Sequence, residues 1–157
     1  MVCASPSTPA PCPHPHSADQ RTAGGGWILG SPNTHRRLML DLVAETGAAV
    51  LFSNYTRSPE AQFPVPIQQS HAVVEWLHDH GSTLSLDPKR VAFASDSAGG
   101  AMAAAVNIMS IQAKRKHLLP KYQVLFYPVT DVSKESCTYT TFKNGKFQHF
   151  HYFQIQN

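Results

Sequence analysis

Short apolar runs and stretches with helical spacing alternate along the middle of the chain. These runs lie at 48–52, 91–94 and, with Gln123 as its one polar residue, 123–127. Runs of this length that are apolar throughout are typical of strands buried on both faces. The sequence therefore predicts three strands that belong to a parallel sheet.

Before the first run and between the later ones, apolar residues recur every three or four positions, which predicts three helices. The first follows a turn at 30–34 that can cap it and ends at Gly47, the second ends at Gly81, and the third covers about 98–113. This alternation predicts an α/β fold, with a parallel central sheet and helices on both faces. The apolar positions expected on the inner helix faces are Leu38, Met39, Leu42 and Val43, then Val73, Val74, Trp76 and Leu77, and finally Met102, Val106 and Met109.

The two ends of the chain differ from this pattern. Residues 1–23 hold five of the twelve prolines, and they lack the apolar stretch of a secretory signal. Because prolines remove backbone donors and disfavour helix, we interpret 1–23 as a disordered, proline-rich leader. The predicted domain covers 24–147. The tail at 148–157 has no Asp, Glu, Lys or Arg and fits neither pattern.

Composition narrows the class of protein. A chain of 157 residues has room for one compact domain, and 42% hydrophobic residues supply its core. The net charge of +3 is too small and too scattered to predict a nucleic-acid surface. No apolar run reaches about 18 residues, so we expect no integral membrane segment. Three cysteines without metal-type spacing favour a reducing compartment, and we expect a cytoplasmic protein.

The segment Ser-Asp-Ser-Ala-Gly-Gly at 95–100 stands where the second predicted strand passes into the third helix. A nucleophile elbow has this context, because a strained turn lifts a serine hydroxyl above the sheet at the N-terminus of a helix. The backbone is crowded there, so small residues are needed two positions before and after the nucleophile. Ser95 and Gly99 meet that need around Ser97. An ordinary strand-to-helix turn with a serine cap is the alternative.

A glycine loop precedes this segment by about seventy residues, with Gly24, Gly25 and Gly26 followed by Trp27. Glycines let the backbone approach a tetrahedral oxyanion and present N–H groups to it. A flexible loop without a catalytic role is the alternative for these residues taken alone.

Together with two further segments, these residues resemble the hormone-sensitive-lipase-like branch of the α/β-hydrolases, the α/β-hydrolase fold-3 family. Its members carry His-Gly-Gly-Gly-Trp, Tyr-Arg-x-x-Pro-Glu, Gly-Asp-Ser-Ala-Gly-Gly and Tyr-Pro-x-x-Asp in that order. This chain has Gly-Gly-Gly-Trp at 24–27, Tyr-Thr-Arg-Ser-Pro-Glu at 55–60, Asp-Ser-Ala-Gly-Gly at 96–100 and Tyr-Pro-Val-Thr-Asp at 127–131. The resemblance covers residues 24 to about 147 and implies part of an α/β-hydrolase domain.

The resemblance also implies a reaction: hydrolysis of small carboxylic esters with short to medium acyl chains, through an acyl-enzyme and without a metal or organic cofactor. Each role is carried over by position. Ser97 is similar to the nucleophile, the amides of Gly25, Gly26 and Ala98 match the oxyanion hole, and Asp96, Gly99 and Gly100 match the supporting residues of the elbow.

The chain departs from the family pattern in two regions. Ala23 stands where the glycine motif has its histidine, and the proline-rich leader replaces the strand expected before the loop. We therefore expect an unpaired sheet edge at that place. Downstream, the family's catalytic acid and histidine have no counterpart in the matched segment. Asp131, His149 and His151 follow in the right chain order, but Asp131 matches a structural position and the histidines lie in the unmatched tail.

Two hypotheses of function follow. The first is a carboxylic ester hydrolase of the esterase or lipase type that uses Ser97 as nucleophile. The second is a catalytically inactive, incomplete α/β-hydrolase that acts, if at all, as an interaction module. They differ in whether Ser97 is activated, because a serine hydroxyl without a general base is a poor nucleophile at neutral pH.

Overall fold

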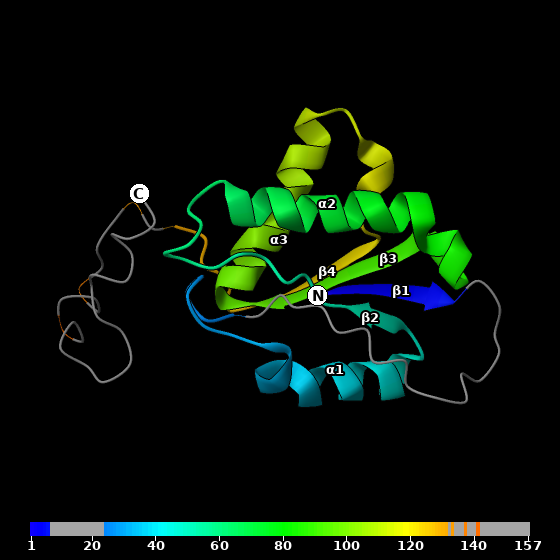
Figure 1. Ribbon diagram of the computed structural model, residues 1–157, viewed down its shortest axis with the longest axis horizontal. Coiled ribbons are helices and arrows are strands. Elements are labelled where there is room, and N and C mark those ends of the chain that lie inside the picture. The colour runs from blue at the N-terminus through cyan, green and yellow to red at the C-terminus, as the bar shows by residue number, and fades with distance from the viewer. Residues whose placement is uncertain (7–23, 132, 134–136, 138–140, 142–157) are drawn as a thin grey trace.

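The computed structural model describes residues 1–6, 24–131, 133, 137 and 141. In these residues a four-stranded sheet lies between helices on its two faces (Figure 1). The strands are β1 (Val2–Pro6), β2 (Ala49–Leu51), β3 (Leu86–Asp96) and β4 (Tyr122–Phe126). The helices are α1 (Pro32–Thr46), α2 (Val65–His80) and α3 (Ser97–Gln112), with short 3-10 helices at Gly81–Leu84 and Lys116–Leu118.

Local sequence signals set both ends of α1, as predicted. The Ser31 hydroxyl accepts a hydrogen bond from the Thr34 amide at 3.2 Å, and Thr34 Oγ1 accepts from the Ser31 amide at 2.9 Å. This reciprocal pair satisfies N–H groups that a helix start otherwise leaves free. At the other end Gly47 takes φ 64°, a left-handed conformation that favours glycine, and its N–H bonds the Val43 carbonyl.

Helix α2 follows its prediction with one exception. Val74 and Leu77 are buried, at 4% and 1% exposure, and the helix ends at His80, directly before Gly81. Trp76, predicted on the same inner face, is 44% exposed and stacks on the ring of His80. The prediction for Trp76 was wrong because residues two apart on a helix do not share a face, so Val74 and Trp76 diverge.

The sheet is mixed rather than wholly parallel. Its strand order is β2-β1-β3-β4, with β3 parallel to β4 and β1 antiparallel to both β2 and β3. It follows that β2, β3 and β4 run in one direction, as predicted for these three strands. The prediction of a parallel sheet is corrected for β1, which runs in the opposite direction between two of them.

Strand β1 also corrects the interpretation of the chain start. Val2–Pro6 was assigned to a disordered leader, yet it forms a central strand. Ala4 is fully buried and Val2 is 7% exposed. The proline content of residues 1–23 taken together concealed this short segment, whose side chains are small or apolar up to Pro6. The sequence predicts an unpaired sheet edge at the place of the missing strand, but β1 pairs there with both β2 and β3. Residues 7–23 lie outside the described part of the chain.

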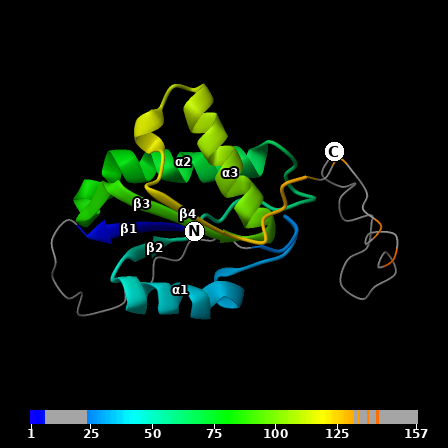
Figure 2. The ribbon, with the colours of Figure 1, turned by 180° about the vertical axis from the view of Figure 1, so that it is seen from behind.

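Alternation along β1 contributes to two hydrophobic clusters, one on each face of the sheet. Figure 2 shows α2 and α3 over one face and α1 over the other. Val2 and Ala4 pack with residues of β3, α2 and α3, whereas Cys3 and the preceding Met1 pack with Val50, Phe52 and the apolar face of α1. The α1 positions in contact are those that the helical spacing predicted: Leu38, Met39, Leu42 and Val43.

The position of β1 can be tested with Ala4→Asp. A charged carboxylate at a fully buried site has no partner, so we expect the free energy of unfolding to fall by about 3 kcal/mol or more. Urea unfolding followed by circular dichroism measures the change. The control is Ala72→Asp at an exposed position of α2, expected to cost less than about 1 kcal/mol. Similar losses in the two variants would contradict a buried β1.

A polar contact joins α2 to α3 inside the protein. His71, which is 8% exposed, places Nε2 3.1 Å from Ser110 Oγ, while its Nδ1 lies 3.6 Å from Glu75 Oε2. Glu75 also pairs with Arg115. Burial lowers the pKa of His71 from its ordinary value of 6.5, and the nearby Arg115 charge lowers it further. The folded protein therefore favours a neutral His71.

The lowered pKa of His71 predicts a pH effect on stability. As the pH falls through about 6.5 the unfolded chain protonates this histidine while the folded chain resists, so protons favour unfolding. The stabilising contribution is present above that pH and is lost below it. We expect the free energy of unfolding to fall less steeply between about pH 7 and pH 5 in His71→Gln than in the wild-type chain. Equal slopes in urea unfolding over this range would contradict the lowered pKa.

Candidate active site

Strand β3 passes into helix α3 without an intervening loop. Asp96, the last strand residue, is extended with φ −124° and ψ 152°, and Ser97, the first helical residue, has φ 48°. A positive φ on a residue with a Cβ atom is strained, at about 1–3 kcal/mol, and such strain concentrates at functional turns. The structure thus has the sharp strand-to-helix turn that the sequence predicted around Ser97.

Small residues after Ser97 let other backbone come close. Ala98, Gly99 and Gly100 are buried in the first turn of α3. A Cβ atom on Gly100 would lie 2.9 Å from the Cβ of Pro128, so only glycine fits against the loop that follows β4. The N–H of Val129 in that loop bonds the Ser97 carbonyl at 3.3 Å. The elbow is therefore packed against the 127–131 segment.

The glycine loop is held by the 55–60 segment. The Ser58 amide donates to the Trp27 carbonyl at 3.0 Å, and the Arg57 guanidinium donates to the Gly30 carbonyl at 2.9 Å. Within the loop, Gly25 has φ 139°, a conformation that side chains rarely adopt, and its carbonyl accepts from two later amides. The loop is thus bonded to its surroundings and has a defined path, unlike the flexible loop given as the alternative.

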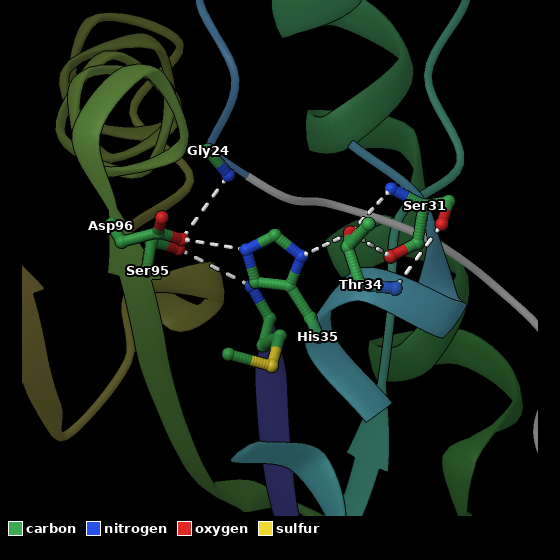
Figure 3. Close-up of polar contacts among 7 residues, drawn as sticks. Gly24, Ser31, Thr34, His35, Ser95 and Asp96 are labelled. Carbon is green, nitrogen blue, oxygen red and sulfur yellow. Dashed lines mark hydrogen bonds and ion pairs between the residues drawn. The ribbon is translucent and has the colours of Figure 1, made fainter. Parts of the chain in front are cut away.

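Asp96 connects this loop to the elbow. Its Oδ1 accepts a hydrogen bond from the Gly24 amide at 3.1 Å and lies 3.5 Å from Nε2 of His35 on α1 (Figure 3). The Asp96 and His35 side chains are 15% and 16% exposed. Gly24 leaves no room for a side chain here, since a Cβ atom would overlap Asp96 Oδ2 and lie 2.8 Å from its Cγ. The glycine loop and the 127–131 segment therefore both contact residues 96–100, and the 55–60 segment is joined to them through the glycine loop.

Three amides predicted for an oxyanion hole are in this region. In the hydrogen bonds among the described residues, the N–H groups of Gly25 and Gly26 have no acceptor. The amide of Ala98 belongs to the first turn of α3, where N–H groups have no partner within the helix and the helix dipole favours negative charge. The region can therefore offer free backbone donors to an anionic group.

Two polar groups flank the elbow from other elements. Burial raises the pKa of Tyr55 to about 12, so its phenol stays neutral beside Arg57 and Asp96. The Met1 nitrogen donates to Ser95 Oγ at 3.2 Å, which ties the start of β1 to the end of β3. Ser95 is 4% exposed, as expected for a small residue in a crowded turn.

A general base for Ser97 is not found in the part of the chain that the structure describes. Its hydroxyl makes no hydrogen bond to any of the described histidines, namely His35, His71, His78, His80 and His117. Asp131 is exposed, and hydrogen bonds from Ser133 lower its pKa. His149 and His151 lie outside the described residues. In the same described residues, no group of three or more His, Cys, Asp or Glu is arranged to hold a metal ion.

Sequence reasoning missed His35. A signal was present, because His35 is three and four positions before Leu38 and Met39 and so shares the inner face of α1. A titratable residue on an apolar face needs a polar partner. That partner, Asp96, lies on another element, and its position could not be derived from helical spacing.

The comparisons with known proteins agree with this geometry. Residues 22–155 match the family described as alpha/beta hydrolase fold. The chain belongs to this family. No helix within the described part of this alpha/beta hydrolase has the length and apolar character needed to cross a membrane.

Relatives of this alpha/beta hydrolase are named esterases. It is 44% identical over 126 residues to an esterase of Gibberella moniliformis, covering 80% of this chain and 39% of the relative. It is 33% identical over 110 residues to an ethyl acetate hydrolase of Pseudomonas putida, covering 70% of this chain and 34% of the relative. The chain thus spans well under half the length of these two relatives.

Solved structures give the same result. Carboxyl esterase 2 of Tuber melanosporum superposes with a TM-score of 0.76 at 42% identity, covering 87% of this chain and 45% of the other. A thermostable esterase of Pseudomonas putida gives a TM-score of 0.71 at 36% identity, with 89% and 45% covered. Both the α/β-hydrolase fold and the resemblance predicted from the sequence are therefore confirmed.

The close approach of the glycine loop to Asp96 can be tested with Gly24→Ala. The added Cβ overlaps the carboxylate, so we expect the Gly24–Asp96 hydrogen bond to break and amide hydrogen exchange in 24–30 to rise about tenfold or more. Hydrogen exchange by mass spectrometry measures it. In the control, Gly47→Ala, the Cβ enters open space, and we expect a loss of about 1 kcal/mol in stability without a change in loop exchange. An unchanged loop in Gly24→Ala would contradict the contact.

Proposed function

We propose that this alpha/beta hydrolase carries the nucleophile and the oxyanion hole of a serine carboxylesterase. The observation that carries the proposal is Ser97 at φ 48°, on a direct junction between β3 and α3, with the glycine loop bonded to the preceding residue. This is the strand–turn–helix context that a nucleophile elbow requires. An ordinary capped turn does not need a strained serine or a glycine loop anchored beside it.

Each residue has a proposed role in acyl transfer. Ser97 Oγ attacks the ester carbonyl carbon, its proton passes to a general base, and the alcohol leaves to give an acyl-enzyme that water then hydrolyses. The amides of Gly25, Gly26 and Ala98 donate to the oxyanion of the tetrahedral intermediate. Asp96, Gly99 and Gly100 support the turn, and the dipole of α3 favours the developing negative charge.

The general base and its acid are proposed to come from residues beyond the described elbow, because nucleophile, acid and histidine follow in that chain order in α/β-hydrolases. This chain covers 39% of one esterase relative and 45% of one solved esterase. A binding and oxyanion site without these two groups retains roughly 10³–10⁴-fold catalysis over water.

The proposed substrates are small carboxylic esters with short to medium acyl chains. The names of the relatives support this class, since they include an ethyl acetate hydrolase and acetyl esterases. The proposed chemistry uses one hydroxyl and backbone N–H groups, so it calls for no cofactor. The cytoplasmic location that the cysteine count favours stays a prediction.

The proposal is tested with Ser97→Ala. We expect a fluorophosphonate probe to label the wild-type chain at Ser97 and not the variant, and hydrolysis of p-nitrophenyl acetate to fall about tenfold or more. Peptide mass spectrometry locates the label, and absorbance at the p-nitrophenolate band gives the rate.

The matched control is Ser85→Ala, because Ser85 is another serine with a positive φ, at 58°, and lies in the turn before β3. Labelling and hydrolysis should keep their wild-type rates in this variant. Equal hydrolysis and no Ser97-dependent labelling in the wild-type chain would contradict the esterase proposal. They would favour the alternative, an inactive member of the family that serves as an interaction module.

A further inference from the structure

Three segments far apart in the sequence converge on one carboxylate. Asp96 is 72 residues from Gly24, whose amide bonds its Oδ1, and the same oxygen faces His35 from the first turns of α1 (Figure 3). Neither His35 nor this contact has a place in the proposed roles of nucleophile and oxyanion hole. The contact nevertheless involves the residue directly before Ser97 and the first glycine of the loop.

We propose that His35 is a positioning residue, which holds the Asp96 carboxylate in the orientation that accepts the Gly24 amide. Through Asp96 it fixes the start of the glycine loop against the elbow. Its effect on catalysis rests on the proposed function, whereas its effect on the Gly24 hydrogen bond does not. His35 acts through Asp96 and has no direct contact with a substrate in this role.

The surroundings of His35 fix its ring. Its Nδ1 lies 2.9 Å from Thr34 Oγ1, and the ring packs on Phe52 with 6.1 Å between centroids. Thr34 Oγ1 also lies 2.7 Å from the Ser31 carbonyl oxygen. In the tautomer with the proton on Nε2, that nitrogen donates toward the Asp96 carboxylate, and Nδ1 accepts from the Thr34 hydroxyl.

The ring therefore acts as a bridge from the capped start of α1 to the elbow. A carboxylate with one hydrogen bond keeps freedom to rotate about its side-chain torsions, whereas a second polar contact at 3.5 Å on the same oxygen restricts it. Because both side chains are largely removed from water, the attraction between them is weakly screened. The Gly24 amide therefore has an acceptor of fixed position. This bond holds the backbone at the start of the loop, directly before the amides of Gly25 and Gly26.

A pair of polar substitutions separates the two sides of the bridge. In His35→Gln the side-chain amide nitrogen stands near the position of Nε2 and can still reach Asp96. In His35→Asn the shorter amide stands near Nδ1, so it keeps the Thr34 side and loses the Asp96 side. The matched control is His78→Asn, because His78 also faces a carboxylate, that of Asp79 at 3.2 Å, away from the elbow.

The primary readout is the Gly24 backbone amide, followed by ¹⁵N–¹H NMR and hydrogen exchange in the full chain. We expect His35→Asn to raise Gly24 exchange about tenfold or more and to move its resonance upfield, as a weakened hydrogen bond requires. We expect His35→Gln and His78→Asn to stay within about threefold of the wild-type rate. The amide of Leu77 in α2 reports global stability and should change in none of them.

The outcomes discriminate between positioning and packing. A purely structural His35 would make the Asn and Gln variants alike or change Leu77 together with Gly24, and either result would overturn the proposal. Unchanged Gly24 exchange in His35→Asn would overturn it as well. The rate of fluorophosphonate labelling at Ser97 is the second readout, expected to fall in His35→Asn and to recover in His35→Gln. If the wild-type chain is not labelled at Ser97, the result counts against the proposed function. The exchange rate of the Gly24 amide still decides the role of His35 in that case.

Discussion

At Asp96 the last residue of β3 passes directly into α3, and Ser97 takes a φ of 48° to make that junction. Such strain persists only where the surrounding structure fixes the turn. Glycine and alanine after Ser97 let the 127–131 segment approach, and Gly24 lets the glycine loop approach from the other side. A larger side chain at either glycine would meet backbone or carboxylate atoms. The candidate site is therefore held by close packing around a strained turn.

The sheet that supports this turn depends on β1 at its centre. With β1 antiparallel between β2 and β3, side chains of alternating positions reach both hydrophobic clusters, and the main-chain groups of β3 find partners on both sides. On the other side of the sheet, β4 is the outermost strand among the described residues. There Tyr122, Val124 and Phe126, alternate residues of one strand, are 47–75% exposed.

The elements of the fold were predictable because their signals are local. Capping at Ser31 and Thr34, the left-handed stop at Gly47, and the apolar runs of β2, β3 and β4 each depend on a few neighbouring residues. Predictions failed where composition was averaged over a long segment, or where residues on different faces of a helix were assigned to one face. Proline content over 23 residues concealed the strand at its start, and Trp76 was grouped with Val74 although their directions on a helix differ. His35 was on the expected face, but its partner is 61 positions away on another element.

By itself, the sequence predicted the candidate residues for acyl chemistry and determined their local context, because a strand–serine–helix turn and a glycine loop are formed by neighbouring residues. The family match over residues 22–155 confirms the α/β-hydrolase resemblance. Only the tertiary structure decided how the motifs are joined: Gly24 to Asp96, Trp27 to Ser58, Ser97 to Val129, and His35 to the same carboxylate. Those contacts depend on distances between segments that chain spacing does not specify, since the packing of helices on the sheet brings them together. For the same reason the direction of β1 became known only when its place between β2 and β3 was seen.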